Sequence, residues 1–242
     1  RGLHSDHITD VPVQCGWVFG HIYFARPDST LNGRLVYTNR MAMGAELARE
    51  YPVDADLVIG VPDSATAAAV GYAEAAGLPY AEGLIKNRYV GRTFIEPTDQ
   101  IRHLGVRLKH NANRGHIEGK RVILVDDSIV RGNTSKRIVA RVREAGAKEV
   151  HIRVGCPPII SPCFLGIDMP SREEFVAPNK TSKEISKEIG ADSVEYITIP
   201  GIVKCIGKEE KDLCLGCITE TYPLQIEGER LRGQATLEQF RA

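Results

Sequence analysis

The chain has 242 residues, with 31 Lys and Arg against 31 Asp and Glu, and 43% of its residues are hydrophobic. This length and composition predict one large globular domain with an ample core and exclude a disordered chain. The zero net charge disfavours a broad polyanion-binding surface and the apolar runs are too short to cross a membrane, so we expect neither a nucleic-acid partner nor a membrane partner.

The N-terminal part of the chain, residues 1–21, has no clear periodicity and is predicted to be a linker segment. It begins with Arg1 rather than Met and shows no secretory leader, so we expect a cytoplasmic fragment or processed product. The short apolar run at 22–24 is typical of a strand, and the spacing of apolar residues at 39–50 predicts a helix.

A buried strand followed by a helix is predicted next. Residues 57–61 form an apolar run rich in β-branched side chains, which is typical of a strand covered on both faces. Asp63 and Ser64 then supply turn and N-cap chemistry. The Ala-rich stretch 65–76 predicts a helix, and Gly77 stands where a C-cap belongs.

The middle of the chain combines a basic loop with a βαβ unit. Residues 86–107 are polar, basic and aperiodic, and we expect a long mobile loop of the kind that often carries function. A strand at 121–125, a helix at 135–145 and a strand at 149–154 follow with short links. The fold class is therefore α/β, with a mainly parallel, twisted sheet flanked by helices and right-handed crossovers.

Prolines interrupt regular structure from residue 156 onward, and a short helix is predicted from Thr181 to about Gly190. We assign residues 22–200 to the main domain. Residues 201–242 form a C-terminal extension that holds three of the six cysteines and packs on that domain.

The residues that follow the strand at 121–125 have the chemistry of a ligand site. Asp126 and Asp127 stand at its carboxyl end, where open α/β sheets bind ligands, and Gly132 opens the next helix. A helix N-terminus presents free N–H groups that suit a phosphate, and Thr134 and Ser135 add hydroxyl donors. Because carboxylates repel phosphate but bind ribose hydroxyls or Mg²⁺, the combination favours a phosphorylated sugar. For the acid pair alone, simple capping of the turn is an alternative reading.

The run 122–135 resembles the phosphoribosyl pyrophosphate loop of the type I phosphoribosyltransferases. Over about residues 22–222 the chain resembles the iron–sulfur branch of the amidophosphoribosyltransferase family. The segments that carry this resemblance are the loop itself and 22–29, 60–64, 83–95 and 162–168.

The resemblance implies that ammonia replaces pyrophosphate at C1 of phosphoribosyl pyrophosphate, which is the first step of purine (IMP) synthesis. It implies Mg²⁺ at Ser64, Asp126 and Asp127, the two acids being catalytic as well. Catalytic basic residues would close over the pyrophosphate, namely Lys86, Arg88 and Arg92. The implied substrate-binding residues are Tyr89, Ser128, Arg131, Gly132, Asn133, Thr134 and Ser135. Without the resemblance, the basic residues would read as a solvated loop.

The resemblance also implies a [4Fe–4S] cluster on Cys15, Cys163, Cys214 and Cys217. Cys15 stands about two residues earlier than the family position, to which Trp17 is nearer, and a small insertion at 16–20 would restore the geometry. Cys156 and Cys205 are alternative fourth ligands, but neither fits the family pattern. A zinc site or free thiols are the alternatives for the Cys-x-x-Cys pair, and the chain has no need of disulfides.

The family further implies a glutaminase domain or subunit that supplies ammonia from glutamine, feedback by purine nucleotides, and a homo-oligomer. Two rival functions remain open at this point. One is a salvage phosphoribosyltransferase that uses a purine or pyrimidine base. The other is a non-catalytic regulator that senses phosphoribosyl pyrophosphate or nucleotides, which the retained acid pair and basic residues disfavour.

Overall fold

The computed structural model describes residues 15–86, 110–165, 167 and 172–224. Its central feature is a four-stranded parallel sheet in the order β4-β7-β8-β9. The strands are Leu57–Gly60 (β4), Arg121–Asp126 (β7), Glu149–Val154 (β8) and Ser193–Tyr196 (β9). This confirms the predicted α/β class with a mainly parallel sheet.

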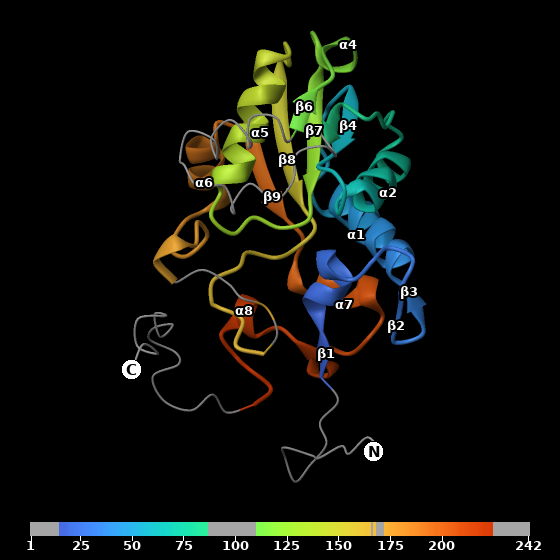
Figure 1. Ribbon diagram of the computed structural model, residues 1–242, viewed down its shortest axis with the longest axis vertical. Helices are drawn as coiled ribbons and strands as arrows, with labels where there is room; N and C mark the ends of the chain where they lie inside the picture. The colour runs from blue at the N-terminus through green and yellow to red at the C-terminus, as the bar shows by residue number, and fades with distance from the viewer. Residues whose placement is uncertain (1–14, 87–109, 166, 168–171, 225–242) are drawn as a thin grey trace, which may run out of the picture.

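Helices cover both faces of this sheet, as Figure 1 shows. Two of them, α1 (Val36–Glu50) and α2 (Thr66–Ala76), lie on one face. The other face carries α5 (Asn133–Glu144) and α6 (Ser182–Ile189). β4 and β7 are almost wholly buried because they are covered on both sides, which explains why they are continuous apolar runs in the sequence.

The helices α1 and α2 pack with their backbones in direct contact. A Cβ built on Gly44 of α1 would lie 1.7 Å from the carbonyl oxygen of Ala68 in α2. Likewise, a Cβ on Gly71 of α2 would lie 2.0 Å from the carbonyl oxygen of Met41. Only glycine allows so close an approach, so this crossing depends on both glycines.

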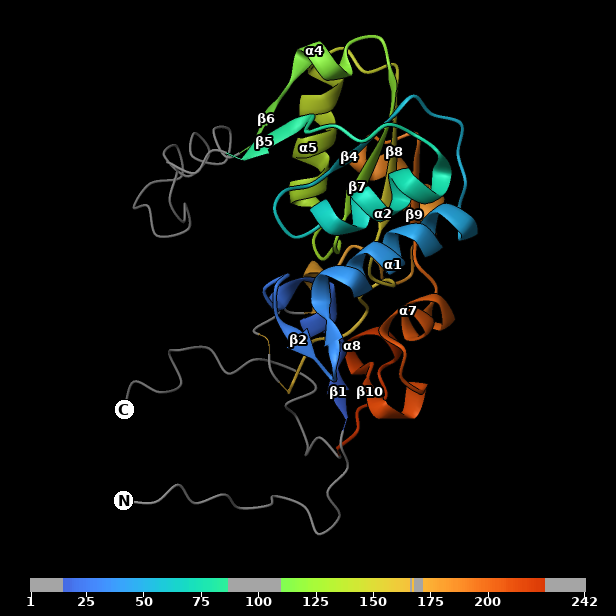
Figure 2. The ribbon, with the colours of Figure 1, turned by 90° about the vertical axis from the view of Figure 1, so that its right-hand side faces the viewer.

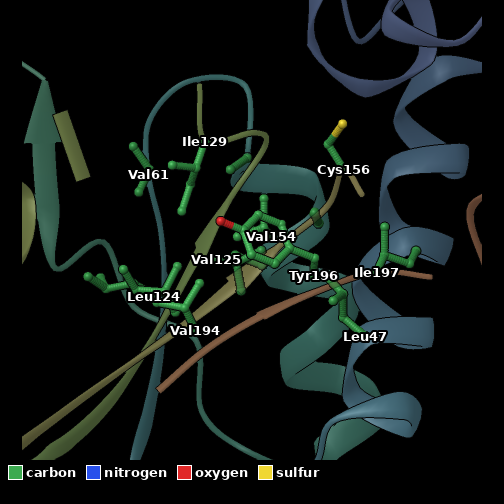
Figure 3. Close-up of a cluster of buried hydrophobic side chains, with 14 of the residues drawn as sticks. Leu47, Val61, Leu124, Val125, Ile129, Val154, Cys156, Val194, Tyr196 and Ile197 are labelled. Carbon is green, nitrogen blue, oxygen red and sulfur yellow. The ribbon is translucent and has the colours of Figure 1, made fainter. Parts of the chain in front are cut away.

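The hydrophobic core lies between the sheet and these helices. Figure 3 shows Leu124 of β7 close to Val194 of β9, and Leu47 of α1 close to Ile197, all in one buried cluster. Cys156, directly after β8, belongs to the same buried cluster. These side chains are essentially inaccessible to solvent, and they hold the carboxyl ends of the strands in fixed positions.

Smaller elements gather beyond the carboxyl ends of the strands (Figure 2). The two-residue strands β1 (Gly16–Trp17) and β10 (Leu213–Cys214) pair in parallel and join the two ends of the described chain. Near them lie the π-helix η1 (Gly20–Phe24) and the helices α7 (Ile199–Ile206) and α8 (Gly216–Thr219). The remaining elements are β2 (Thr30–Leu31), β3 (Arg34–Leu35), β5 (Leu84–Lys86), β6 (His110–Ala112), α4 (Arg114–Ile117), η3 (Arg172–Glu174) and η4 (Glu210–Asp212).

Most of the predicted elements are confirmed, and the glycines end the helices as expected. Gly77 and Gly190 both adopt left-handed backbone conformations, with φ of 66° and 84°, at the C-caps of α2 and α6. At the other end of α6, Thr181 and Glu184 form a capping box. These local signals were readable because they depend on residues close together in the chain.

Two local predictions are wrong. Residues 22–24 belong to the π-helix η1 rather than to a strand, because this apolar run packs against α1 and closes through the N–H of Ala25 to the carbonyl of Gly20. Asp63 and Ser64 do not cap α2, whose N-cap is Ala65 without a side-chain hydrogen bond. Their side chains instead bind Lys86 and Asp127.

Within the described part of the chain, no helix is long and apolar enough to cross a membrane. The domain limits 1–21, 22–200 and 201–242 stay predictions, and α7 runs across the proposed limit at residue 200.

Candidate functional site

The turn between β7 and α5 forms the centre of the site. Asp126 ends β7 at the carboxyl edge of the sheet, and Gly132 is the N-cap of α5 with a φ of 75°. No side chain caps this helix, so the first N–H groups of α5 remain directed at the space in front of the turn. The helix dipole adds positive potential at the same place. The turn therefore combines an acidic end with an anion-binding end.

A second strand delivers its own loop to the same edge. Strands β4 and β7 are parallel, and the N–H of Val61 donates to the carbonyl of Val125 over 2.9 Å. The loop after β4 thereby brings Ser64 against Asp127, to which the Ser64 hydroxyl donates a hydrogen bond. The Pro62–Asp63 peptide bond in this loop is cis.

A cavity of about 760 Å³ opens in front of these two loops. It brings together most of the predicted site residues that the structure describes, from Ser64 and Lys86 to the whole run from Asp126 to Ser135. Its lining comprises Tyr23, Val61, Pro62, Asp63, Ser64, Lys86, His110, Asp126, Asp127, Ser128, Ile129, Val130, Arg131, Gly132, Asn133, Thr134, Ser135 and Arg137. This volume suits a ligand the size of a phosphorylated sugar.

Asp126 is buried and Asp127 is half-buried, and both carboxylates lie in an electrostatically unfavourable environment. Burial raises the pKa of Asp126 well above the usual carboxylate range, and the charge of Asp127 raises it further. Burial also raises the pKa of Asp127, although hydrogen bonds from Ser64 and Ser128 and the charge of Arg40 oppose the shift. The Ser128 hydroxyl donates over 2.7 Å to Asp127, and the N–H of Asp127 donates over 2.9 Å to Asp126. A cation in the cavity would relieve this strain.

Arg40 of α1 places a buried positive charge near Asp127. Its guanidinium is only 2% exposed and donates to the carbonyl oxygens of His21 over 2.9 Å and Ala25 over 2.8 Å. These two carbonyls flank Tyr23, which lines the cavity. Burial, followed by the charge of Asp127, raises the pKa of Tyr23 to about 12, so its hydroxyl stays protonated.

The basic residues are only partly described. The ammonium of Lys86, at the end of β5, forms an ion pair with Asp63 at 2.5 Å on the cavity wall. Arg131 pairs with Glu174. The predicted contributions of Arg88, Tyr89 and Arg92 lie outside the described residues.

Several cavity residues were missed in the sequence analysis. Tyr23 belongs to a segment that carried the resemblance, yet no role was assigned to it, and Asp63 was read as a cap. His110 and Arg137 reach the cavity from β6 and α5, and Arg40 acts from behind it. Of these, only Arg137 could have been predicted from its spacing, because it lies about one and a half helical turns after Gly132 on the same helix. The positions of the others depend on the tertiary fold.

The cysteines form a second group of interest, below the sheet. All six are free thiols. Cys214, Cys217 and Cys156 are buried, while Cys15 and Cys163 are half-buried. A hydrogen bond with Cys163, and then burial, raise the pKa of Cys217. Cys163 also acts electrostatically on Cys214, so these three thiols of two separate segments are neighbours.

The β1–β10 pairing brings Cys15 to the same group. Trp17 is in register with Cys214, and Gly16 with Leu213. Side chains two apart on a strand share one face, so Cys15 lies on the face of Trp17 and Cys214. Its pKa is raised by burial and then by Cys214.

The thiols do not already form the coordination shell of a single metal ion. Among the described residues, no three His, Cys, Asp or Glu side chains are arranged to hold one ion. Four thiols from three segments that approach in pairs nevertheless match the Cys₄ donor set of an iron–sulfur cluster, whose ligands surround four iron atoms rather than one. The donor chemistry therefore fits the cluster.

The fold and the cavity together define a phosphoribosyltransferase. A parallel sheet presents an acid pair and an uncapped helix N-terminus at one edge. The chain matches the phosphoribosyl transferase domain family over residues 31–189, and it belongs to that family.

The relatives that it resembles are amidophosphoribosyltransferases, which confirms the resemblance found in the sequence. The enzyme of Methanocaldococcus jannaschii is 57% identical over 217 residues, covering 90% of this chain and 46% of the relative. That of Synechocystis sp. is 50% identical over 241 residues, covering 100% of this chain and 49% of the relative. The chain therefore spans about half the length of the curated relatives it matches.

A solved structure gives the same result. The glutamine phosphoribosylpyrophosphate amidotransferase from B. subtilis, complexed with ADP and GMP, matches with a TM-score of 0.84 and 49% identity. The match covers 93% of this chain and 50% of that chain.

Proposed function

We propose that this chain is the phosphoribosyltransferase half of an amidophosphoribosyltransferase. It would convert phosphoribosyl pyrophosphate and ammonia into 5-phosphoribosylamine and pyrophosphate, the first step of purine synthesis. The observation that carries the proposal is one cavity that joins the acid pair to the free N-terminus of α5. The identity of 46–57% with the amidophosphoribosyltransferases supports this family over the salvage transferases.

The two ends of the cavity orient the substrate. The 5-phosphate would accept hydrogen bonds from the N–H groups at the start of α5 and from the hydroxyls of Thr134 and Ser135. The ribose hydroxyls would then face Asp126 and Asp127, and C1 would point toward Ser64 and Lys86. This order follows from charge, because only the acidic end repels a phosphate.

The proposed reaction exchanges one bond at C1 for another. The bond from C1 to the pyrophosphate oxygen breaks, and its electron pair leaves with the pyrophosphate. The lone pair of ammonia forms the new C1–N bond, and the nitrogen then loses a proton to solvent water. The carboxylates below the ring stabilise the positive charge that develops on the sugar.

The residues at the acidic end fit a Mg²⁺ ion. Mg²⁺ in proteins is held by one or two carboxylates together with water and substrate phosphates, so Asp126, Asp127 and the Ser64 hydroxyl are a sufficient set. When bound, Mg²⁺ neutralises charge on the pyrophosphate. Burial raises the pKa of both acids, and the positive charge of the ion would oppose that shift.

Lys86 would cover the pyrophosphate from the rim of the cavity. It is the last residue of β5, and its ammonium already lies at the cavity wall. Arg88 and Arg92 are proposed to join it, so that the segment excludes water from the reactive sugar.

We further propose that ammonia comes from glutamine through a glutaminase domain or subunit, as the name of the B. subtilis relative suggests. That relative was solved with ADP and GMP, which supports purine nucleotides as feedback ligands. A cytoplasmic homo-oligomer completes the proposal.

The test is pyrophosphate release with ammonium chloride as the nitrogen source. We expect turnover that requires phosphoribosyl pyrophosphate, Mg²⁺ and ammonia together. If folded protein turns over only with a purine or pyrimidine base, the salvage alternative replaces the proposal. If it binds nucleotides but shows no turnover of either kind, the regulator alternative does.

We also propose that Cys15, Cys163, Cys214 and Cys217 bind a [4Fe–4S] cluster that joins the β1–β10 pair to the sheet. Anaerobic purification should yield close to four irons per chain with visible absorbance. Cys15→Ser should lose the cluster, whereas Cys205→Ser, a buried thiol on α7 whose neighbours are Glu46 and Lys204, should keep it. Equal iron content in the two variants would exclude Cys15 as a ligand, and one zinc per chain would replace the cluster by a zinc site.

A further inference from the structure

Tyr222 connects the two segments that carry the clustered cysteines. It follows α8, and its hydroxyl donates over 2.6 Å to the carbonyl oxygen of Pro162, the residue before Cys163. The same hydroxyl lies 2.8 Å from the hydroxyl of Ser161. One side chain from the C-terminal segment thus holds the backbone next to a cysteine that is about sixty residues away in sequence.

The ring of Tyr222 packs against both segments. A Cβ built on Gly216 would lie 2.2 Å from the ring, so the ring rests directly on the backbone next to Cys217. Its other neighbour is Phe164, directly after Cys163, with ring centroids 5.2 Å apart in an edge-to-face arrangement. The glycine of the Cys-Leu-Gly-Cys motif is therefore required by the aromatic ring that covers it.

Backbone hydrogen bonds and an ion pair add to the contacts that Tyr222 makes between these two segments. The N–H groups of Ile160 and Ser161 donate to the carbonyl of Cys217 over 2.9 and 3.1 Å. Arg172 donates to the Ser161 hydroxyl over 3.0 Å and pairs with Glu220 at 2.5 Å. Ser161 is fully buried, so its polar contacts are made in the absence of competing water.

We propose that Tyr222 is a positioning residue that sets Cys163 against Cys214 and Cys217 for the metal group. The inference rests on the proposed cluster. Cys163 lies on a loop of irregular backbone, whereas Cys15 directly precedes β1, Cys214 ends β10 and Cys217 lies in α8. Without the contacts of Tyr222, closing that loop onto Cys217 costs conformational entropy each time a metal binds. These contacts hold the backbone beside Cys163 against the α8 segment, where the thiols of Cys163 and Cys217 are hydrogen-bonded.

The test uses Tyr222→Phe, which keeps the ring on Gly216 but removes the hydroxyl. Tyr37→Phe is the matched control, because Tyr37 is 37% exposed and lies on α1, in a different element from the cysteine segments. The measurements on the anaerobically purified chain are iron and sulfide content and the rate at which a chelator bleaches the visible absorbance. We expect bleaching of Tyr222→Phe to be about tenfold faster than that of the control, from the loss of the part-buried hydrogen bonds of this hydroxyl with Pro162 and Ser161.

A second measurement separates this inference from the cluster proposal. In the metal-free chain, we expect Tyr222→Phe to increase alkylation of Cys163 several-fold, with Cys214 unchanged and far-ultraviolet circular dichroism as in the wild type. Gly216→Ala, which displaces the ring, should have the same selective effect. If the wild type holds no iron, the cluster proposal fails while the alkylation experiment still decides the role of Tyr222. Equal Cys163 alkylation in Tyr222→Phe and Tyr37→Phe overturns the inference.

Discussion

Replacement of Gly132 by alanine tests the phosphate end of the cavity. Gly132 has a φ of 75°, and a Cβ placed there would meet Val176 at 3.4 Å, an ordinary van der Waals distance. Space is therefore available, and the cost is conformational. A left-handed backbone costs a non-glycine residue about 1–2 kcal/mol. At roughly 2–4 °C per kcal/mol for a chain of this size, the unfolding temperature should fall by a few degrees.

Gly77 supplies the matched control. Its φ is 66° and nothing lies within 4 Å of a Cβ built there, so Gly77→Ala carries the same conformational cost. It stands at the C-cap of α2, away from the cavity. The two variants should therefore lose similar stability in thermal unfolding followed by circular dichroism.

Their kinetics should differ. If Gly132→Ala relaxes toward a negative φ, the first N–H groups of α5 turn away from the 5-phosphate. A hydrogen bond to a charged group contributes about 1.5–3 kcal/mol, so the loss of one raises KM for phosphoribosyl pyrophosphate about ten- to a hundredfold. Gly77→Ala should leave KM unchanged in the same pyrophosphate-release assay. An equal KM in the two variants would refute the assignment of this turn to the phosphate.

Three further predictions concern the acid pair and the helix crossing. Asp127→Asn should reduce kcat by on the order of 10²–10³-fold in a folded chain, because the amide still accepts from Ser64 but carries no charge; retention of more than a tenth of the wild-type kcat would contradict this. Burial raises the pKa of Asp126 and Asp127 in the folded chain above their unfolded values. The negative charges of the two carboxylates therefore destabilise the folded chain at pH values above the folded pKa, and this destabilisation disappears as the pH falls through that pKa. The Mg²⁺ concentration for half-maximal activity should accordingly rise on acidification at pH values above the ordinary carboxylate range, and a flat Mg²⁺ requirement would count against the site. Gly44→Ala should lower the free energy of unfolding measured in urea by about 3 kcal/mol, because its Cβ would lie 1.7 Å from the Ala68 carbonyl oxygen. This loss includes a gain of about 1 kcal/mol in helix propensity. Unchanged stability would mean that the two helices separate at little cost.

The amino-acid sequence was sufficient for features that depend on neighbouring residues. The apolar run of β7, the acids at its end and Gly132 at the start of α5 lie within twelve residues, so their relative positions follow from local geometry. The helix ends at Gly77 and Gly190 were readable for the same reason. Because strands that are parallel carry their carboxyl ends to one edge, the location of the ligand site could be inferred as well.

The run at 22–24 shows where local pattern was insufficient. A short apolar segment has the same composition in a strand and in a buried helical turn, so its period cannot be determined. The outcome depended on Arg40, whose buried guanidinium binds the carbonyls of His21 and Ala25 from another element. Asp63 and Ser64 likewise do not cap α2, because their side chains bind Lys86 and Asp127, which are distant in sequence.

The sequence by itself therefore determined the class of fold, the acid pair and the glycine turn that opens α5, because each is encoded within one or two successive elements. Only the tertiary structure decided which distant side chains join them: Tyr23 and His110 in the cavity, and Tyr222 across the segment of Cys163. Such contacts depend on how strands pair and helices pack, and a residue's identity does not specify the partner it will meet.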